Sequence, residues 1–190
     1  MKAECRASNV LSADRFIGDS FGPATKASLR KAYSPELRAA LARSKPADWL
    51  PREHLVELLT LVVSVHGPTP QSEKKLYACG RAIFDDATNM FIRLVLKMAT
   101  PAIFAKKFPD FWQRDFRGSG HGQVDTSEID RNHISVSFHG IEGFNYVAPL
   151  GIGFVGLAME RVTGKKVTME LRDWSFDNPG PSQTHYEVSW

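Results

Sequence analysis

Cysteine is scarce in this chain of 190 residues, and its scarcity excludes two kinds of structure. Cys5 and Cys79 are the only cysteines, and 73 residues separate them in the sequence. Two cysteines so far apart make neither the disulfide framework of a small secreted domain nor a cysteine-based zinc site. The fold must therefore be stabilised by burial of apolar side chains.

Long apolar runs and an excess of one charge are also missing. No stretch approaches the ~18 consecutive apolar residues that span a bilayer. The first twelve residues carry Lys2, Glu4 and Arg6 and lack the apolar segment of a secretory signal. The net charge is +3 and no segment concentrates the basic residues, which argues against an electrostatic nucleic-acid surface. We expect a cytoplasmic chain with no transmembrane segment and no nucleic-acid partner.

What the chain has is an ordinary globular composition, with 43% hydrophobic and 24% charged residues. Its length suits one well-buried core. Residues 1–20 read as a flexible leader, and residues 21–190 read as a single domain.

The first half of the sequence has helical periodicity. Residues 25–43 predict a helix that restarts near Pro35, and a second helix is expected after Pro51. The longest helix is expected over 72–98, where apolar residues recur at steps of three and four. Thr100 and the proline that follows it predict the start of another helix, which Pro109 should split.

The second half changes to a period of two after the glycine-rich loop 118–122. Strands are expected near 123–128, 134–138, 167–171 and 186–190, each with one apolar and one polar face, as in antiparallel sheets. One more helix is expected over 149–162, ended by Gly164. The sequence thus predicts an α+β fold, in which a helical layer packs on a four-stranded antiparallel sheet in the order helices, hairpin, helix, hairpin.

The segment GIGFVG at 151–156 matches the G-x-G-x-x-G fingerprint of dinucleotide-binding proteins. Glu170 even lies near the distance at which such proteins place a ribose-binding acid. However, Pro149 interrupts the preceding strand, and the strands alternate in polarity instead of being apolar on both faces. We therefore expect no NAD site and interpret the glycines as positions of close helix packing.

Other candidates for chemistry are weak. His133, His139 and His185 share the polar faces of their strands and are candidate metal ligands, although exposed strand histidines usually have no such role. Cys79 lies beside the apolar stripe of the long helix, where a cysteine usually packs as a small hydrophobe. The sequence shows no catalytic group, so an enzyme is the less favoured interpretation.

Several segments together resemble a known group of proteins. They are Leu76–Phe84 of the long helix, the restart at Thr100, the aromatic segment Phe108–Phe116, the sequence GIGFVGLAMERVTG at 151–164, and the terminal hairpin that ends in Trp190. Over residues 45–190 they resemble a family of myxobacterial paralogous proteins of unknown function. That family is similar in turn to the 4-vinyl reductase domain, the TRAPP vesicle-tethering subunits and the haem-nitric-oxide-binding fold.

The resemblance implies a homodimer and an apolar pocket between helices and sheet. It favours a non-catalytic sensory or regulatory domain that binds a small hydrophobic ligand. The candidate pocket residues are Cys79, Ile83, Phe84, Phe91, Phe154 and Met159. The chain has no Tyr-x-Ser-x-Arg pattern and no histidine marked as a proximal ligand, so neither haem nor another cofactor is expected. Two alternatives stay open: a protein-interaction module without a ligand, and a nucleotide-dependent enzyme that uses GIGFVG.

Overall fold

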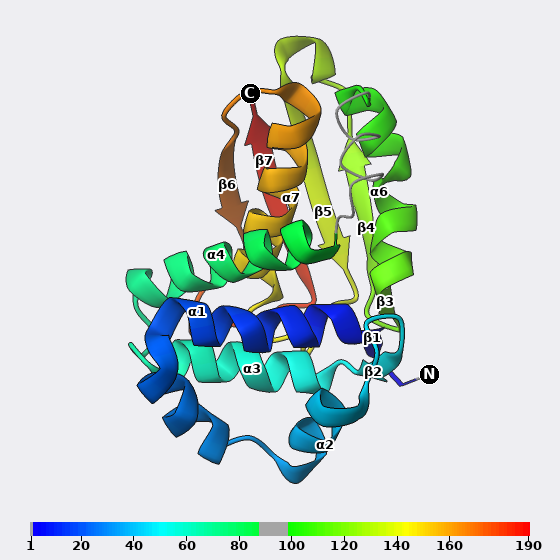
Figure 1. Ribbon diagram of the computed structural model, residues 1–190. Coiled ribbons are helices and arrows are strands. Elements are labelled where there is room, and N and C mark those ends of the chain that lie inside the picture. Colours follow the sequence, from blue (N-terminus) through cyan, green and yellow to red (C-terminus); the bar gives the residue numbers. More distant parts are fainter. Residues whose placement is uncertain (1, 88–98) are drawn as a thin grey trace.

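The computed structural model describes residues 2–87 and 99–190, and Figure 1 shows their arrangement. The helices are α1 (Ala7–Lys31), α2 (Pro35–Arg43), α3 (Glu53–Ser64), α4 (Pro70–Ala87), α6 (Pro101–Asp115), the short 3-10 turn η1 (Ile129–Arg131) and α7 (Val147–Thr163). The strands are β1 (Glu4–Arg6), β2 (Trp49–Pro51), β3 (Phe116–Arg117), β4 (His121–Asp125), β5 (His133–His139), β6 (Thr168–Arg172) and β7 (Gln183–Ser189). The predicted α+β class is confirmed.

The larger sheet has four antiparallel strands in the order β4-β5-β7-β6. Residues of β5 and β7 alternate between buried and partly exposed positions, as the period of two predicted. Ile134, Val136 and Phe138 are buried on the inner face, where they meet Tyr186 and Val188 of β7. The sheet therefore has one face on the core and one polar outer face.

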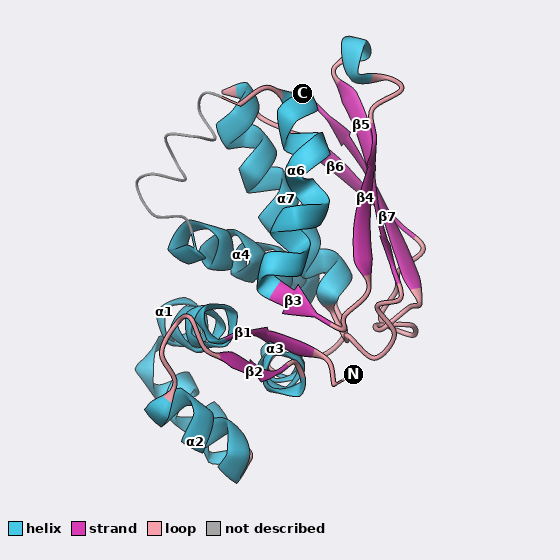
Figure 2. Ribbon diagram, turned by 90° about the vertical axis from the view of Figure 1, so that its right-hand side faces the viewer, coloured by secondary structure: helices cyan, strands magenta, loops and turns pink. Residues whose placement is uncertain are grey.

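Helices cover the inner face of this sheet. In Figure 2, α6 and α7 lie against the sheet, while α1, α2 and α3 lie toward the other end of the molecule with the smaller sheet. Helix α4 crosses α7, and the two are tied by an ion pair of 2.7 Å between Arg81 and Glu160. The layer that faces the sheet is thus built from helices distant in the sequence.

Glycines allow α4 and α7 to approach closely. A Cβ atom added at Gly153 would collide with the carbonyl oxygen of Tyr77, and one added at Gly80 would collide with that of Leu150. The GIGFVG segment therefore lies inside α7 and not at a turn between a strand and a helix, where the dinucleotide fingerprint requires it. The interpretation of its glycines as close-packing positions is confirmed.

The N-terminal segment differs from the flexible leader expected over residues 1–20. Strand β1 is the centre of a three-stranded sheet in the order β2-β1-β3, and α1 begins directly after it. Cys5, Val10 and Ile17 are fully buried. The sequence signal was weak because a strand of three residues is too short to show a period.

Three smaller predictions concern the ends and continuity of helices. Thr100 caps α6, since its side chain accepts a hydrogen bond from the backbone of Ile103. Pro109 lies inside α6 and does not split it. Helix α4 begins at Pro70, two residues before the predicted start at 72, and the hydroxyl of Ser72 inside the helix donates to the carbonyl of Gly67 at 2.6 Å. The predicted extension of this helix beyond residue 87 lies outside the described residues.

Candidate functional site

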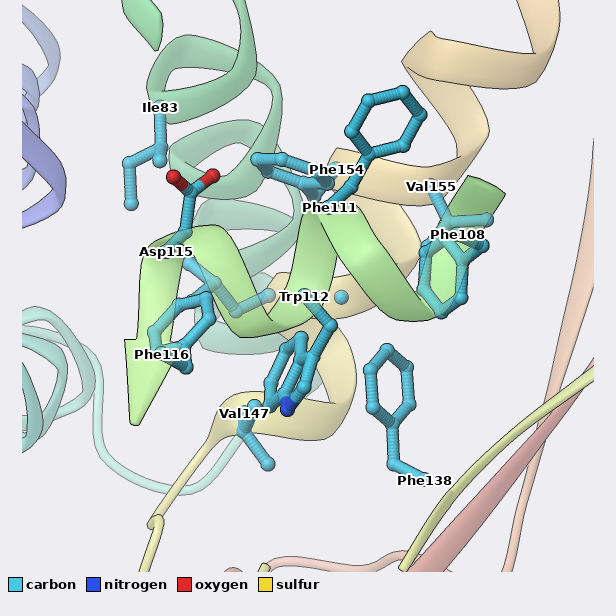
Figure 3. Close-up of a pocket in the computed structure, with 12 residues that line it drawn as sticks. Ile83, Phe108, Phe111, Trp112, Asp115, Phe116, Phe138, Val147, Phe154 and Val155 are labelled. Carbon is cyan, nitrogen blue, oxygen red and sulfur yellow. The ribbon is translucent and has the colours of Figure 1, made fainter. Parts of the chain in front are cut away.

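A small apolar pocket lies where α4, α6 and α7 meet the inner face of the sheet (Figure 3). Its volume is about 30 Å³, which leaves room for at most a few water molecules. Most of its lining is aromatic or aliphatic, and the lining residues are Ile83, Phe108, Phe111, Trp112, Asp115, Phe116, Phe138, Val147, Leu150, Gly151, Phe154 and Val155. A larger guest enters only if some of these side chains move.

Aromatic rings make up one wall of the pocket. The ring of Trp112 stacks on Phe116 with centroids 4.3 Å apart and lies 4.5 Å from Phe138. Phe108 meets the edge of Phe138 at 5.5 Å. Trp112 also donates through its indole nitrogen to the carbonyl of Gly120 at 3.3 Å, which fixes the indole. Ring faces of this kind suit a flat apolar guest.

Phe154 forms part of the other wall, from α7. Its ring meets Phe84 of α4 edge to face, with centroids 5.1 Å apart. Phe154 is partly buried, whereas Phe84 is almost completely buried. The Phe154 ring is therefore a side chain that can move without opening the whole core.

Asp115 is the one charged residue among the lining residues. Its side chain is 9% exposed, and both of its carboxylate oxygens accept from Arg114, at 3.0 and 2.9 Å. In Figure 3 the carboxylate lies at one side of the pocket near Ile83, away from Phe138. This buried acid and its pairing with Arg114 mark this side as the polar end of the site.

The structure brings together some of the predicted site residues. Ile83 and Phe154 line the pocket, and Phe84 packs on Phe154. Cys79 and Met159 are fully buried but do not line it. Phe91 lies outside the described residues.

Burial makes both cysteines poor nucleophiles. It raises the pKa of the Cys79 thiol to about 12. It also raises the pKa of Cys5 to about 12, with a further contribution from the nearby charge of Glu53. A thiol must ionise to attack or to ligate a metal, so both side chains act as packing groups.

The predicted histidines lie on the outer face of the sheet, away from the pocket. Glu187 accepts from the Nε2 atoms of His133 and His185, each at 2.8 Å, and from the hydroxyl of Ser135 at 2.7 Å. His139 instead lies against His121, with ring centroids 5.3 Å apart. Within residues 2–87 and 99–190, no group of three or more histidine, cysteine or acidic side chains is placed to hold a metal ion.

Comparison with known proteins identifies the fold. No protein-family model matches the chain, and no curated protein matches it in sequence. The structure is similar to that of an unliganded Fe(II) H-NOX protein from K. algicida, with a TM-score of 0.71, 10% identity, and coverage of 97% of this chain and 95% of that one. It is also similar to an H-NOX protein from S. oneidensis in the Fe(II)NO state, with a TM-score of 0.67, 10% identity, and coverage of 97% and 98%.

A third solved structure, from work on modulating heme redox potential through protein-induced porphyrin distortion, has a TM-score of 0.63, 10% identity, and coverage of 97% and 99%. The resemblance to the haem-nitric-oxide-binding fold is therefore confirmed over nearly the whole chain. The likeness to the myxobacterial group, the 4-vinyl reductase domain and the TRAPP subunits finds no support in these matches.

These structures contradict one prediction from the sequence. The chain was expected to have no cofactor, with haem unexpected, yet the proteins that share its fold are described with ferrous iron, nitric oxide and heme. The prediction relied on a missing sequence pattern. At 10% identity, a fold can persist after such a pattern has changed.

The pocket residues themselves offer little to an iron atom. Axial ligands of haem iron are histidine, cysteine, methionine or tyrosine side chains, and none of these types is among the lining residues in 2–87 and 99–190. Pockets that bind drug-sized ligands or cofactors also have volumes of roughly 300–1,000 Å³, far above the 30 Å³ of this pocket. As it stands, the pocket does not fit a haem held through its iron.

Sequence reasoning missed Asp115 and most of the aromatic wall. Phe108, Trp112 and Phe116 were noticed only as an aromatic segment, because helical spacing does not show which ring faces a cavity. Phe138 was assigned to the inner face of its strand but not to a site. A local signal did exist, since Asp115 lies within the aromatic segment Phe108–Phe116.

Proposed function

We propose that this chain is a non-catalytic sensory domain that binds a flat apolar ligand in the pocket between α4, α6, α7 and the sheet. The observation that carries the proposal is the aromatic wall formed by Trp112, Phe116 and Phe138, at the junction of the helices and the sheet. Apolar pockets with few polar groups are the usual form of small-molecule sites.

The shared fold makes haem the first compound to test. The neighbours described with ferrous iron and heme cover the same length of chain, and the aromatic lining would suit the faces of a porphyrin ring once lining side chains move and enlarge the pocket. Because none of the described lining side chains is an iron ligand, the ring itself would supply most of the binding free energy. Iron-free protoporphyrin IX should then bind about as well as ferric haem.

The experiment titrates the full chain with protoporphyrin IX and with ferric haem and follows tryptophan fluorescence. We expect saturable binding of one molecule per chain, with quenching of Trp112. The variant Trp112→Phe should lose most of the quenching while Trp49, Trp174 and Trp190 keep their emission. Absence of saturable quenching by either compound would contradict the proposal.

The protein-interaction alternative, including the predicted homodimer, has less support from the described surface than the pocket has as a ligand site. Among the described residues, the large hydrophobic side chain that is exposed is Ile103, at 53%. The surface that these residues form therefore has no broad apolar patch. Light scattering of the purified chain tests this alternative, and a stable dimer would favour it. No helix in the described residues is long and apolar enough to cross a bilayer.

A further inference from the structure

An open groove of about 310 Å³ adjoins the aromatic pocket. The groove is lined by Arg6, Ser8, Pro46, Ala47, Ala87, Arg114 and Asp115. Asp115 is the residue common to the linings of the groove and the pocket. The groove and the pocket therefore border the same carboxylate, at the polar end of the pocket.

Arg6 supplies a fixed positive charge in this groove. Its guanidinium donates to the carbonyls of Arg114 and Ala47, at 3.1 and 2.6 Å, and lies 4.0 Å from the ring centroid of Trp49. Arg117 lies over the same indole at 3.8 Å. In the described part of the chain Arg6 has no acidic partner within salt-bridge distance, so carbonyls and an aromatic ring hold its charge in place without neutralising it.

Arg114 supplies the second charge. It uses its Nε and one terminal nitrogen on Asp115, and its side chain is 42% exposed. A guanidinium has five N–H donors, so donors remain for a second anion. The groove lining thus contains two guanidiniums and one carboxylate, and that carboxylate is already paired with Arg114.

We propose that the groove and the pocket form one site for an amphipathic anion. The apolar ring of the ligand lies in the aromatic pocket, and a carboxylate or sulfonate group lies in the groove between Arg6 and Arg114. This inference rests on the proposed function, because the ring occupies the same pocket. It adds the chemical class of the ligand and the residues that recognise its charge.

Two fluorescent probes distinguish the contribution of the anionic group to binding from that of the ring system. 8-Anilinonaphthalene-1-sulfonate carries an anionic group, and N-phenyl-1-naphthylamine has the same ring system without it. For the wild-type chain we expect the sulfonate to bind more tightly. Arg6→Gln should weaken binding of the sulfonate by roughly 10-fold or more, the value of one charge-assisted hydrogen bond, and leave binding of the neutral probe unchanged.

The second variant removes the charge of Arg114 without leaving Asp115 as an unpaired buried acid. Arg114→Gln alone leaves Asp115 as an unpaired buried acid, which destabilises the fold. The double variant Arg114→Gln/Asp115→Asn removes both charges and should also weaken the sulfonate more than the neutral probe. Arg131→Gln is the matched control, since Arg131 forms an exposed pair with Glu128 on η1.

The outcomes distinguish the two proposals. If the neutral probe does not bind to the wild-type chain, the proposed function itself is contradicted. If both probes bind equally well, or if Arg6→Gln weakens both by the same factor, the anion site is overturned while the apolar pocket stands. Selective loss of sulfonate binding in both variants supports the anion site.

Discussion

At the scale of single residues, Glu187 shows how the outer face of the sheet is held. Its carboxylate joins His133 and Ser135 of β5 to His185 of its own strand. The hydrogen bond from Ser135, followed by those from His185 and His133, lowers the pKa of Glu187 from its ordinary value of 4.5 to about 2. This network contributes to stability and lies apart from the pocket.

The network predicts a specific dependence of stability on pH. Because the folded pKa of Glu187 is below the unfolded one, its stabilisation is present above pH 4.5 and is lost as the pH falls from about 4.5 toward 2. Glu187→Gln should lower the free energy of unfolding at neutral pH by about 1 kcal/mol, since the side chain is partly exposed. The difference from the wild type should shrink over that acid range in urea titrations.

Glu128→Gln is the control for this prediction, because Glu128 is exposed and pairs only with its neighbour Arg131 among the residues described. It should change stability little at any pH. A difference between Glu187→Gln and the wild type that stays constant down to pH 2 would refute the assigned role of the carboxylate.

At the scale of elements, the crossing of α4 and α7 depends on glycine. The two helices approach so closely that Gly153 faces the backbone of Tyr77, and Gly80 faces the backbone of Leu150. By contrast, Gly156 of the same motif faces the flexible side chain of Met169, with the sulfur 2.9 Å from an added Cβ. The GIGFVG motif therefore contains glycines that differ widely in their tolerance of an added side chain.

Alanine substitutions should reveal that difference. Gly153→Ala forces two backbones apart and should cost about 3 kcal/mol or more in the free energy of unfolding. Gly156→Ala should cost little, because the methionine can move and alanine favours the helix. Thermal unfolding of both variants is the measurement. Equal stabilities would show that the helices do not cross through these glycines.

Much of this architecture can be predicted from the sequence, because the signals for strands and for helix ends lie in short stretches of the chain. Alternation near 134–138 and 186–190 predicts the two-faced strands β5 and β7, and Thr100 followed by proline predicts the start of α6. The small sheet was not predicted, because β1, β2 and β3 have three, three and two residues, and only their pairing makes them strands. That pairing joins segments far apart in the chain.

At the scale of the whole molecule, the site is harder to predict than the fold. The pocket draws residues from α4, α6, β5 and α7, so no single stretch of sequence carries its signal. Of the candidate pocket residues, Ile83 and Phe154 line this pocket, whereas Cys79 and Met159 pack elsewhere in the core. The resemblance to the haem-nitric-oxide-binding fold could be predicted from the sequence, whereas the expectation of no cofactor is contradicted by the solved structures of that fold, which are described with ferrous iron and nitric oxide.

The most direct test of an apolar ligand in this pocket is to enlarge it and measure binding of N-phenyl-1-naphthylamine by fluorescence. Phe154→Ala removes a ring that the ligand would otherwise displace, while Phe21→Ala removes a partly buried ring outside the pocket. Moving a ring off its preferred rotamer costs roughly 1 kcal/mol, so Phe154→Ala should bind about 5-fold more tightly than the wild type. Phe21→Ala should bind like the wild type. Equal affinity in all three proteins, or no binding in any, would contradict the account.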